Sequence, residues 1–260
     1  MLINLIQGLI NGQDSFKSVL IQFLITIPIV LISLSIHEFS HGYASYLLGD
    51  NTARNYGRLT LNPLKHLDPM GTLCMVLFGF GWAKPCPVNP RYYKHPRSGM
   101  AITAAAGPLS NIILAFLSLI FMNLVGIIPM SIGGYTVTAS HLASLSAAVG
   151  AYWVLFIDGA GFGVMVVGVA YLFFYLMAIM NLYLAVFNLI PIPPLDGSRI
   201  LFIFLPTKVY FGVMKYERYI MIAMFLLLWL GVFDGTIGWV ADKLFDGMNW
   251  LITRIPIFGK

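Results

Sequence analysis

The sequence predicts an all-α integral membrane protein with about four transmembrane helices, a re-entrant segment and amphipathic helices at the membrane interface. Of the 260 residues, 59% are hydrophobic and only 10% are charged, whereas soluble domains carry roughly a quarter charged residues. The mean hydropathy is +0.85, and apolar runs long enough to cross a bilayer recur along the chain. Because little room remains for a soluble domain, we expect residues 1–260 to form a single membrane-embedded domain.

Four apolar stretches are candidate transmembrane helices. Residues 16–48 form the first, which is longer than the ~20 residues that a bilayer requires and which ends at the helix-stop sequence Gly49-Asp50-Asn51. Met100–Ile128 is the second, Ile157–Ile190 contains the third, and Tyr219–Phe233 is a short fourth. These stretches predict a helical bundle within the membrane.

Three shorter stretches predict the remaining membrane-associated elements. Pro69–Trp82 has about 14 residues and is interrupted by glycines, so a re-entrant segment fits it better than a full span. Residues 2–11 and 237–251 mix apolar and polar positions at helical spacing, which predicts amphipathic helices at the interface. We expect no removable signal peptide.

The basic residues predict the topology. Seven of the 15 lie between the first and second spans, and four lie between the third and fourth. If the ambiguous stretch His141–Ile157 does not cross the membrane, loops 50–98 and 199–218 share one face, which the positive-inside rule makes cytoplasmic. Topology and anionic lipids therefore explain the net charge of +5, and we expect no nucleic-acid partner.

Cys74 and Cys86 match neither a disulfide framework nor a cysteine-type zinc site.

His37-Glu38-Phe39-Ser40-His41 lies inside the first apolar run. On a helix, positions i and i+4 are neighbours, so both imidazoles can reach one ion. Glu38 is rotated by about 100° from His37 and flanks the ion, which is the position of a general base for metal-bound water. The alternative is a pair of hydrogen-bonded core histidines, but Glu38 would then add an ionisable group with nothing to gain in lipid.

A catalytic zinc usually has three protein ligands and one open position. His66 and His95 lie in basic loops and His141 lies on the opposite side, so we expect interfacial or solvated roles for all three. Asp196 follows the third span in Asn188-Leu189-Ile190-Pro191-Ile192-Pro193-Pro194-Leu195-Asp196-Gly197, where the prolines must break the helix. The opened chain can aim Asp196 at the histidines, or Asp196 can be an ordinary turn residue.

These motifs resemble those of the site-2 protease family of intramembrane zinc metalloproteases, in its compact form without PDZ or CBS domains. The His37–His41 motif and the Asn188–Gly197 stretch are similar to the family's two zinc motifs. Gly107-Pro108-Leu109-Ser110-Asn111 resembles a segment of the family's intervening core helix, and residues 81–90 resemble a segment of its compact bacterial and archaeal members. The resemblance covers most of residues 34–218; the apolar stretch 139–158 departs from it.

The resemblance implies that Zn²⁺ is held by His37, His41 and Asp196, one ion per chain, with Glu38 as the catalytic base. It also implies that Asn188 orients substrate or supports the transition-state oxyanion, although an amide that caps the broken helix end is an equal alternative. Asn111 is a further substrate-site candidate, with helix packing as the simpler explanation.

The expected reaction is hydrolysis of peptide bonds in or near transmembrane segments of other membrane proteins. The expected location is a prokaryotic cell (inner) membrane, with the lipid bilayer and a transmembrane substrate as partners. The segments Pro69–Trp82 and Pro191–Gly197 are candidates for an edge or gate that receives the unwound substrate. A metal transporter and a non-catalytic membrane scaffold remain alternatives, whereas five histidines are too few for a di-iron hydroxylase. The sequence does not indicate the oligomeric state.

Overall fold

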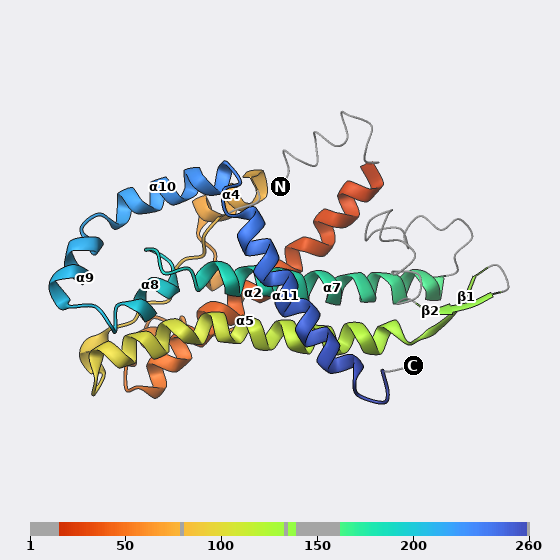
Figure 1. Cartoon of the computed structure of the whole chain (residues 1–260), viewed down its shortest axis with the longest axis horizontal. Helices are drawn as coiled ribbons and strands as arrows, with labels where there is room; N and C mark the ends of the chain where they lie inside the picture. The colour runs from red at the N-terminus through yellow and green to blue at the C-terminus, as the bar shows by residue number, and fades with distance from the viewer. Residues whose placement is uncertain (1–15, 79–80, 133–134, 139–161, 259–260) are drawn as a thin grey trace.

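The computed structural model describes residues 16–78, 81–132, 135–138 and 162–258 (Figure 1). The α-helices, in chain order, are α2 (Phe16–Leu47), α3 (Thr52–Asn55), α4 (Pro69–Phe78), α5 (Pro96–Gly126), α7 (Phe162–Asn188), α8 (Asp196–Leu201), α9 (Thr207–Met214), α10 (Glu217–Trp229) and α11 (Asp234–Thr253). The shorter elements are the 3-10 turns η1 (Pro63–Lys65) and η2 (Pro90–Tyr92) and the strands β1 (Pro129–Ile132) and β2 (Tyr135–Thr138).

Three long apolar helices form the core of the described part of the chain. The stretches that could cross a membrane are Phe23–Leu47 in α2, the whole of α5 and the whole of α7. Helices α5 and α7 lie side by side and run in opposite directions, and α2 packs against both (Figure 1). Apolar side chains fill the contacts: Ile29 of α2 and Leu172 of α7 belong to one buried cluster, and Leu119 of α5 and Ala178 of α7 belong to another. The all-helical membrane class predicted from composition is confirmed.

The fourth predicted span is a shorter helix. The stretch Tyr219–Phe233 corresponds to α10, which has 13 residues. At 1.5 Å per residue it covers only about 20 Å, less than the ~30 Å of a hydrocarbon core. Among the described helices, three are long and apolar enough to cross the bilayer, so the predicted count of about four is not confirmed.

The predicted re-entrant stretch contains α4 and then returns towards its own start. A Cβ atom added to Gly71 would lie 2.1 Å from the carbonyl oxygen of Trp82. The two backbones can therefore approach only because residue 71 has no side chain. The chain enters and leaves this excursion at adjacent points, as a re-entrant segment would.

The C-terminal amphipathic helix is present as α11. Of the apolar positions that recur at helical spacing, Ile237 is buried and Met248 packs against the core clusters, so the packed face agrees with the sequence pattern only in part. Helix α11 crosses over α7 and α5 (Figure 1). Ala241 lies in a buried cluster with Leu182, and Ile252 lies in a buried cluster with Leu119. Leu244 and Leu251, which the sequence pattern placed on the apolar stripe, are exposed. Lipid-facing leucines in a membrane protein are as apolar as core residues, so hydrophobicity alone does not identify the packed face.

The connection between α5 and α7 begins with an antiparallel hairpin that was not predicted. Pro129 pairs with Thr138 and Ile132 with Tyr135. The stretch His141–Ile157 lies outside the described residues, as does the amphipathic stretch 2–11. The ends of α2 and α7 and the start of α5 lie towards the same end of the bundle (Figure 1). Loops 50–98 and 199–218 therefore leave the bundle from one end.

Candidate metal centre and its surroundings

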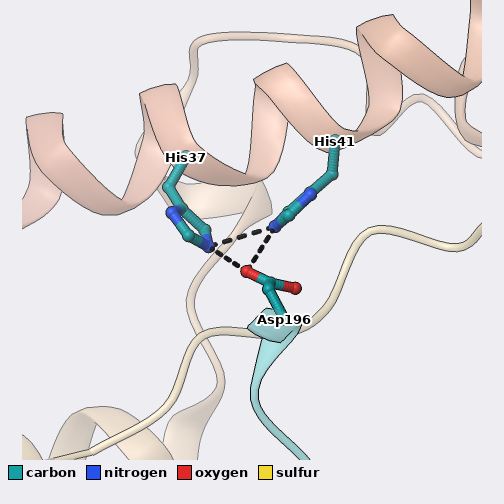
Figure 2. A group of neighbouring side chains, drawn as sticks. All are labelled: His37, His41 and Asp196. Carbon is teal, nitrogen blue, oxygen red and sulfur yellow. Dashed lines mark hydrogen bonds and ion pairs between the residues drawn. The ribbon is translucent and has the colours of Figure 1, made fainter. Parts of the chain in front are cut away.

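One turn of α2 carries three ionisable side chains into the protein interior. His37, Glu38 and His41 are 5%, 8% and 9% exposed, although they lie within a helix long and apolar enough to cross the membrane. Because residues four apart share one helix face, the two imidazoles project together (Figure 2). Their Nε2 atoms are 3.0 Å apart.

Asp196 approaches these imidazoles from the other side. Helix α7 ends at Asn188, the proline-rich stretch is not helical, and α8 begins at Asp196 itself. The break predicted from the prolines is confirmed. The Asp196 Oδ2 atom lies 3.2 Å from His37 Nε2 and 3.1 Å from His41 Nε2 (Figure 2). The structure thus brings together three possible metal ligands from two distant parts of the chain.

The second nitrogen of each imidazole is held by an acceptor. His41 Nδ1 lies 2.7 Å from the carbonyl oxygen of Thr103, which can only accept a hydrogen bond. His37 Nδ1 lies 2.6 Å from Asn111 Oδ1, which is also an acceptor. Both imidazoles therefore donate from Nδ1, and in a neutral ring this leaves a lone pair on Nε2.

Three electron-pair donors consequently face one another. The two Nε2 lone pairs and Asp196 Oδ2 have no hydrogen atom to share, and Oδ2 is buried without a hydrogen-bond partner. Such a cluster is unfavourable unless a cation lies between its members. Their separations of 3.0–3.2 Å are near the about 3.3 Å expected for two ligands of a tetrahedral zinc with bonds of ~2.05 Å. Two imidazoles and a carboxylate are ligands that zinc accepts.

Gly107 of α5 lies directly against the two imidazoles. A Cβ atom at this position would come within 2.4 Å of His41 Nε2 and 2.7 Å of His37 Cε1. No side chain fits there without moving a ring, so the glycine allows α5 to support the histidines at close range. The sequence motif contained Gly107, but its contact with the histidines could not be assigned from the motif alone.

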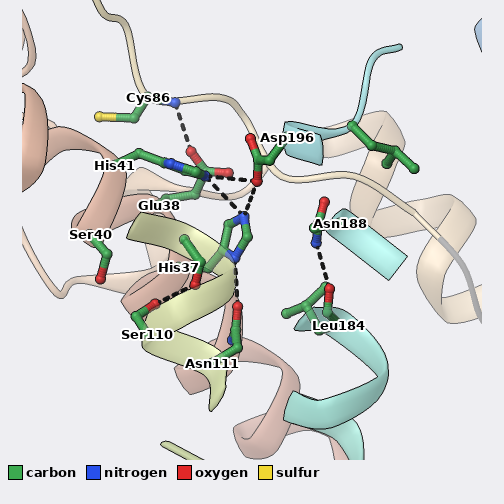
Figure 3. Close-up of polar contacts among 12 residues, drawn as sticks. His37, Glu38, Ser40, His41, Cys86, Ser110, Asn111, Leu184, Asn188 and Asp196 are labelled. Carbon is green, nitrogen blue, oxygen red and sulfur yellow. Dashed lines mark hydrogen bonds and ion pairs between the residues drawn. The ribbon is translucent and has the colours of Figure 1, made fainter. Parts of the chain in front are cut away.

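Glu38 lies beside the cluster without joining it. Its Oε2 atom accepts a hydrogen bond from the backbone N–H of Cys86 at 2.7 Å. Figure 3 shows the carboxylate next to His41 and Asp196. No other hydrogen bond of Glu38 is present in the described part of the chain, so Oε1 remains available for a proton.

The segment Lys84–Asn89, which contains Cys86, is held at both ends by hydrogen bonds to buried charged residues. Arg58 donates to the carbonyl oxygens of Lys84 and, at 3.3 Å, of Pro85. Asp50 Oδ2 accepts from the backbone N–H of Asn89 at 2.7 Å. Arg58 is 7% exposed and Asp50 is fully buried. The sequence analysis assigned neither residue a role.

The contacts of this segment shift the pKa values of Asp50 and Cys86. Burial alone would raise the pKa of Asp50, but the hydrogen bonds that it accepts from Thr52, Asn89 and Ser45 outweigh burial and lower the pKa below its usual range. Burial and the charge of Glu38 raise the pKa of the Cys86 thiol to about 11, against the opposing effect of Arg58.

The two asparagine candidates occupy different surroundings. Asn111 is fully buried and bonds His37 as described, so its side chain lies behind the imidazole. Asn188 is half-buried in the last turn of α7, where Nδ2 donates to the Leu184 carbonyl oxygen at 2.9 Å. Figure 3 shows Asn188 on the Asp196 side of the cluster. The hydrogen bond to Leu184 lies within the last turn of the helix. The Asn188 oxygen, on the side of the site, remains available to accept a hydrogen bond.

One of the other histidines is not where the sequence predicted. His66, expected to be interfacial or solvated, is only 1% exposed, and its Nε2 lies 2.7 Å from the Thr60 carbonyl oxygen. That prediction was wrong: the ring is enclosed within the folded loop, where Nε2 is paired with this local carbonyl and Nδ1 is buried without a hydrogen-bond partner among the described residues. His95 is exposed as expected, and His141 lies outside the described residues.

Comparisons with known proteins agree with this geometry. Residues 25–231 match peptidase family M50. The protein named "Putative zinc metalloprotease YwhC" of Bacillus subtilis (strain 168) is 36% identical over 210 residues, which cover 81% of this chain and 82% of that protein. "Putative zinc metalloprotease Rip2" of Mycolicibacterium smegmatis (strain ATCC 700084 / mc(2)155) is 34% identical over 102 residues, covering 37% of this chain and 39% of that protein.

No solved structure matches the chain. The family match nevertheless spans most of the residues and includes all three possible metal ligands and Glu38. The resemblance drawn from the motifs is therefore confirmed. The chain belongs to peptidase family M50, the site-2 protease family, and is a membrane-embedded zinc metallopeptidase.

Proposed function

We propose that this protein is an intramembrane protease that hydrolyses peptide bonds in or near transmembrane segments of other membrane proteins, with Glu38 as general base. One observation carries the proposal. Two of the possible zinc ligands, His37 and His41, and the adjacent carboxylate of Glu38 are buried on a helix that can cross the bilayer, and the third, Asp196, is buried against them. Ionisable residues at such depth are costly and mark functional sites.

In this proposal His37, His41 and Asp196 hold the zinc ion. When bound, zinc lowers the pKa of a coordinated water towards ~7 and polarises a carbonyl group. Glu38 Oε1 takes a proton from the attacking water and later delivers it to the leaving amine. The Cys86 N–H keeps Oε2 occupied, so proton transfer uses one defined oxygen.

Thr103 and Asn111 orient the imidazoles. Asn188 supplies an amide for substrate or the developing oxyanion.

A helical substrate must unwind before its peptide bond can reach Glu38. The excursion Pro69–Trp82 and the turn Pro191–Gly197 are proposed as the edge or gate that receives the opened strand. The second of these carries Asp196 and so lies at the metal ligands. If a disulfide between cysteines introduced into these two segments left cleavage unimpaired, a gate at this position would be excluded.

We further propose that residues 1–260 act as one membrane-embedded domain in a prokaryotic cell membrane. Loops 50–98 and 199–218 carry most of the basic residues and leave the bundle from the same end, which supports a cytoplasmic location for both.

The test is substitution of Glu38 by Gln in the full chain reconstituted in liposomes. Cleavage of a single-span membrane substrate should fall by about 10²–10⁴-fold, while the zinc content measured by mass spectrometry stays unchanged. Glu217→Gln is the matched control, because Glu217 begins α10 and is not among the possible metal ligands, and this substitution should leave both quantities unchanged. Full cleavage by Glu38→Gln would contradict the proposed base.

The same preparation separates the alternatives. A transporter would move zinc into the liposomes without cleaving the substrate, and a scaffold would do neither. A transport path also needs ligands in series, whereas the described residues contain one group of possible ligands.

A further inference from the structure

A buried chain of hydrogen bonds leads from His37 into the interior of the helix bundle. Asn111 Nδ2 donates to Asn181 Oδ1 at 2.7 Å. Asn181 Nδ2 in turn donates to Ser33 Oγ at 2.9 Å and to the Met177 carbonyl oxygen at 2.8 Å. Asn111 and Asn181 are both 0% exposed. Two amides are therefore completely buried among three apolar helices, where each is costly unless its bonds are made.

At the end of this hydrogen-bond series that is far from His37, the donor and the acceptor cannot be exchanged. The Met177 carbonyl oxygen is an acceptor and cannot donate. Asn181 must therefore turn its NH₂ group towards Met177 and its oxygen towards Asn111. An oxygen at that position requires Asn111 to present its own NH₂ group, which leaves the Asn111 oxygen facing His37 Nδ1. His37 must then carry its proton on Nδ1.

The opposite orientation of Asn111 would disable the ligand. If Asn111 turned its NH₂ group towards His37, the imidazole would have to accept at Nδ1 and carry its proton on Nε2. The Nε2 atom that faces Asp196 would then lack the lone pair that binds zinc. His41 does not need such a relay, because a backbone carbonyl oxygen, that of Thr103, sets its tautomer directly.

We infer that Asn181 is a positioning residue for the metal centre: it orients the Asn111 amide and thereby selects the His37 tautomer that binds zinc. It acts through Asn111 and touches neither substrate nor ion. The signal in the sequence was an amide in the middle of an apolar span, but only the fold shows that it lies next to Asn111. This inference rests on the proposed role of His37 as a zinc ligand.

The experiment measures the zinc dissociation constant of the full chain in detergent micelles by competition with a chromophoric chelator. Asn181→Leu removes the nearer of the two acceptors of Asn111 Nδ2 and leaves only the Ser33 carbonyl oxygen at 3.4 Å, while nearly keeping the side-chain volume. Zinc affinity should weaken by about tenfold, within the range for outer partners of metal ligands. Asn181→Asp should stay within about threefold of the wild type. Whether protonated or ionised, its carboxyl group still offers Asn111 an oxygen.

A purely structural role would not produce this difference between Leu and Asp, because a buried carboxyl group disturbs packing more than leucine does. Asn123→Leu is the matched control. Asn123 Nδ2 donates to Asn249 Oδ1 at 2.9 Å and to the Leu119 carbonyl oxygen at 2.8 Å. The control therefore breaks a similar amide pair between α5 and another helix, and zinc affinity should not change.

The double variant tests whether the two amides form one relay. If Asn181 acts only through Asn111, Asn181→Leu should have no further effect on zinc affinity once Asn111→Ala is present. The inference would be overturned if the double variant weakened zinc affinity by the product of the two single effects. It would also be overturned if Asn181→Leu kept wild-type zinc affinity. If Asn181→Leu does not fold, Asn181→Ala makes the same test. Absence of zinc from the wild type would instead refute the proposed site.

Discussion

The backbone N–H of Cys86 donates a hydrogen bond to Glu38 Oε2 at 2.7 Å, and the two residues are 48 positions apart in the sequence. A segment from outside the transmembrane bundle therefore holds the carboxylate of the proposed base. One oxygen of Glu38 is occupied and the other is directed towards His41 and Asp196 (Figure 3). In the proposed mechanism, the position of the carboxylate therefore matters as well as its charge.

We therefore predict that Glu38→Asp impairs cleavage although a carboxylate remains. The side chain is shorter by one methylene, so it cannot both bond the Cys86 N–H and reach the same proton. A displacement of about 1 Å at a reacting centre can cost about 10²-fold in rate, and cleavage should fall by that order. The zinc content should remain at one ion per chain. Wild-type cleavage by Glu38→Asp would show that the Cys86 contact does not position the base.

Substitution of Gly107 by Ala should remove zinc from the protein. The added methyl group would meet His41 Nε2 at 2.4 Å and His41 Cε1 at 2.5 Å, so at least one imidazole must leave its position. Zinc content and cleavage should be lost together. Gly163→Ala is the control, because a Cβ atom there meets nothing within 4 Å, and it should retain zinc. A Gly107→Ala protein with normal zinc content would contradict the close packing of α5 on the histidines.

The sequence could predict those parts of the site that depend on local geometry. His37 and His41 share a helix face whatever the rest of the chain does. The prolines after Asn188 stop α7 in any context, which gave the correct position of the break before Asp196. The three long apolar runs likewise had to become helices if they lie in lipid.

The rest depends on contacts between distant segments, which no local pattern encodes. Asn181 is one polar residue in an apolar run until α7 packs against α5. Asp50 appeared to be part of a helix-stop sequence, yet its carboxylate reaches Asn89. The packed face of α11 could not be separated from its lipid-facing side, because Leu251 is as apolar as Ile252. In a membrane protein hydrophobicity identifies the spans but not their neighbours.

Asp50→Asn should destabilise the protein at neutral pH. Asp50 accepts four hydrogen bonds, from Ser45, Asn89 and both the backbone and the side chain of Thr52. An amide would turn a donor towards one of these donors, which should cost about 2 kcal/mol. Thermal unfolding in detergent measures the difference. Asp246→Asn, at an exposed position on α11, should have no measurable effect.

The effect of Asp50 should also depend on pH. Because folding lowers the pKa of Asp50, the stabilisation is complete above its unfolded pKa of ~3.9 and is lost as the pH falls through the lower folded value. The stability difference between the wild type and Asp50→Asn should therefore be constant near neutrality and shrink below about pH 4. A difference that grows with acidification would contradict a lowered pKa.

The Cys86 thiol should resist alkylation at a pH where an ordinary thiol reacts. Its pKa of about 11 leaves roughly one thiolate in a thousand at pH 8, against roughly a quarter for a free cysteine of pKa ~8.5. N-ethylmaleimide should therefore modify the Cys74→Ser variant, which retains only Cys86, at least about 10²-fold more slowly than the unfolded chain. The Cys86→Ser variant should react faster, because Cys74 is only partly buried. Equal rates for the two single-cysteine proteins would mean that the Lys84–Asn89 segment does not stay closed over Glu38.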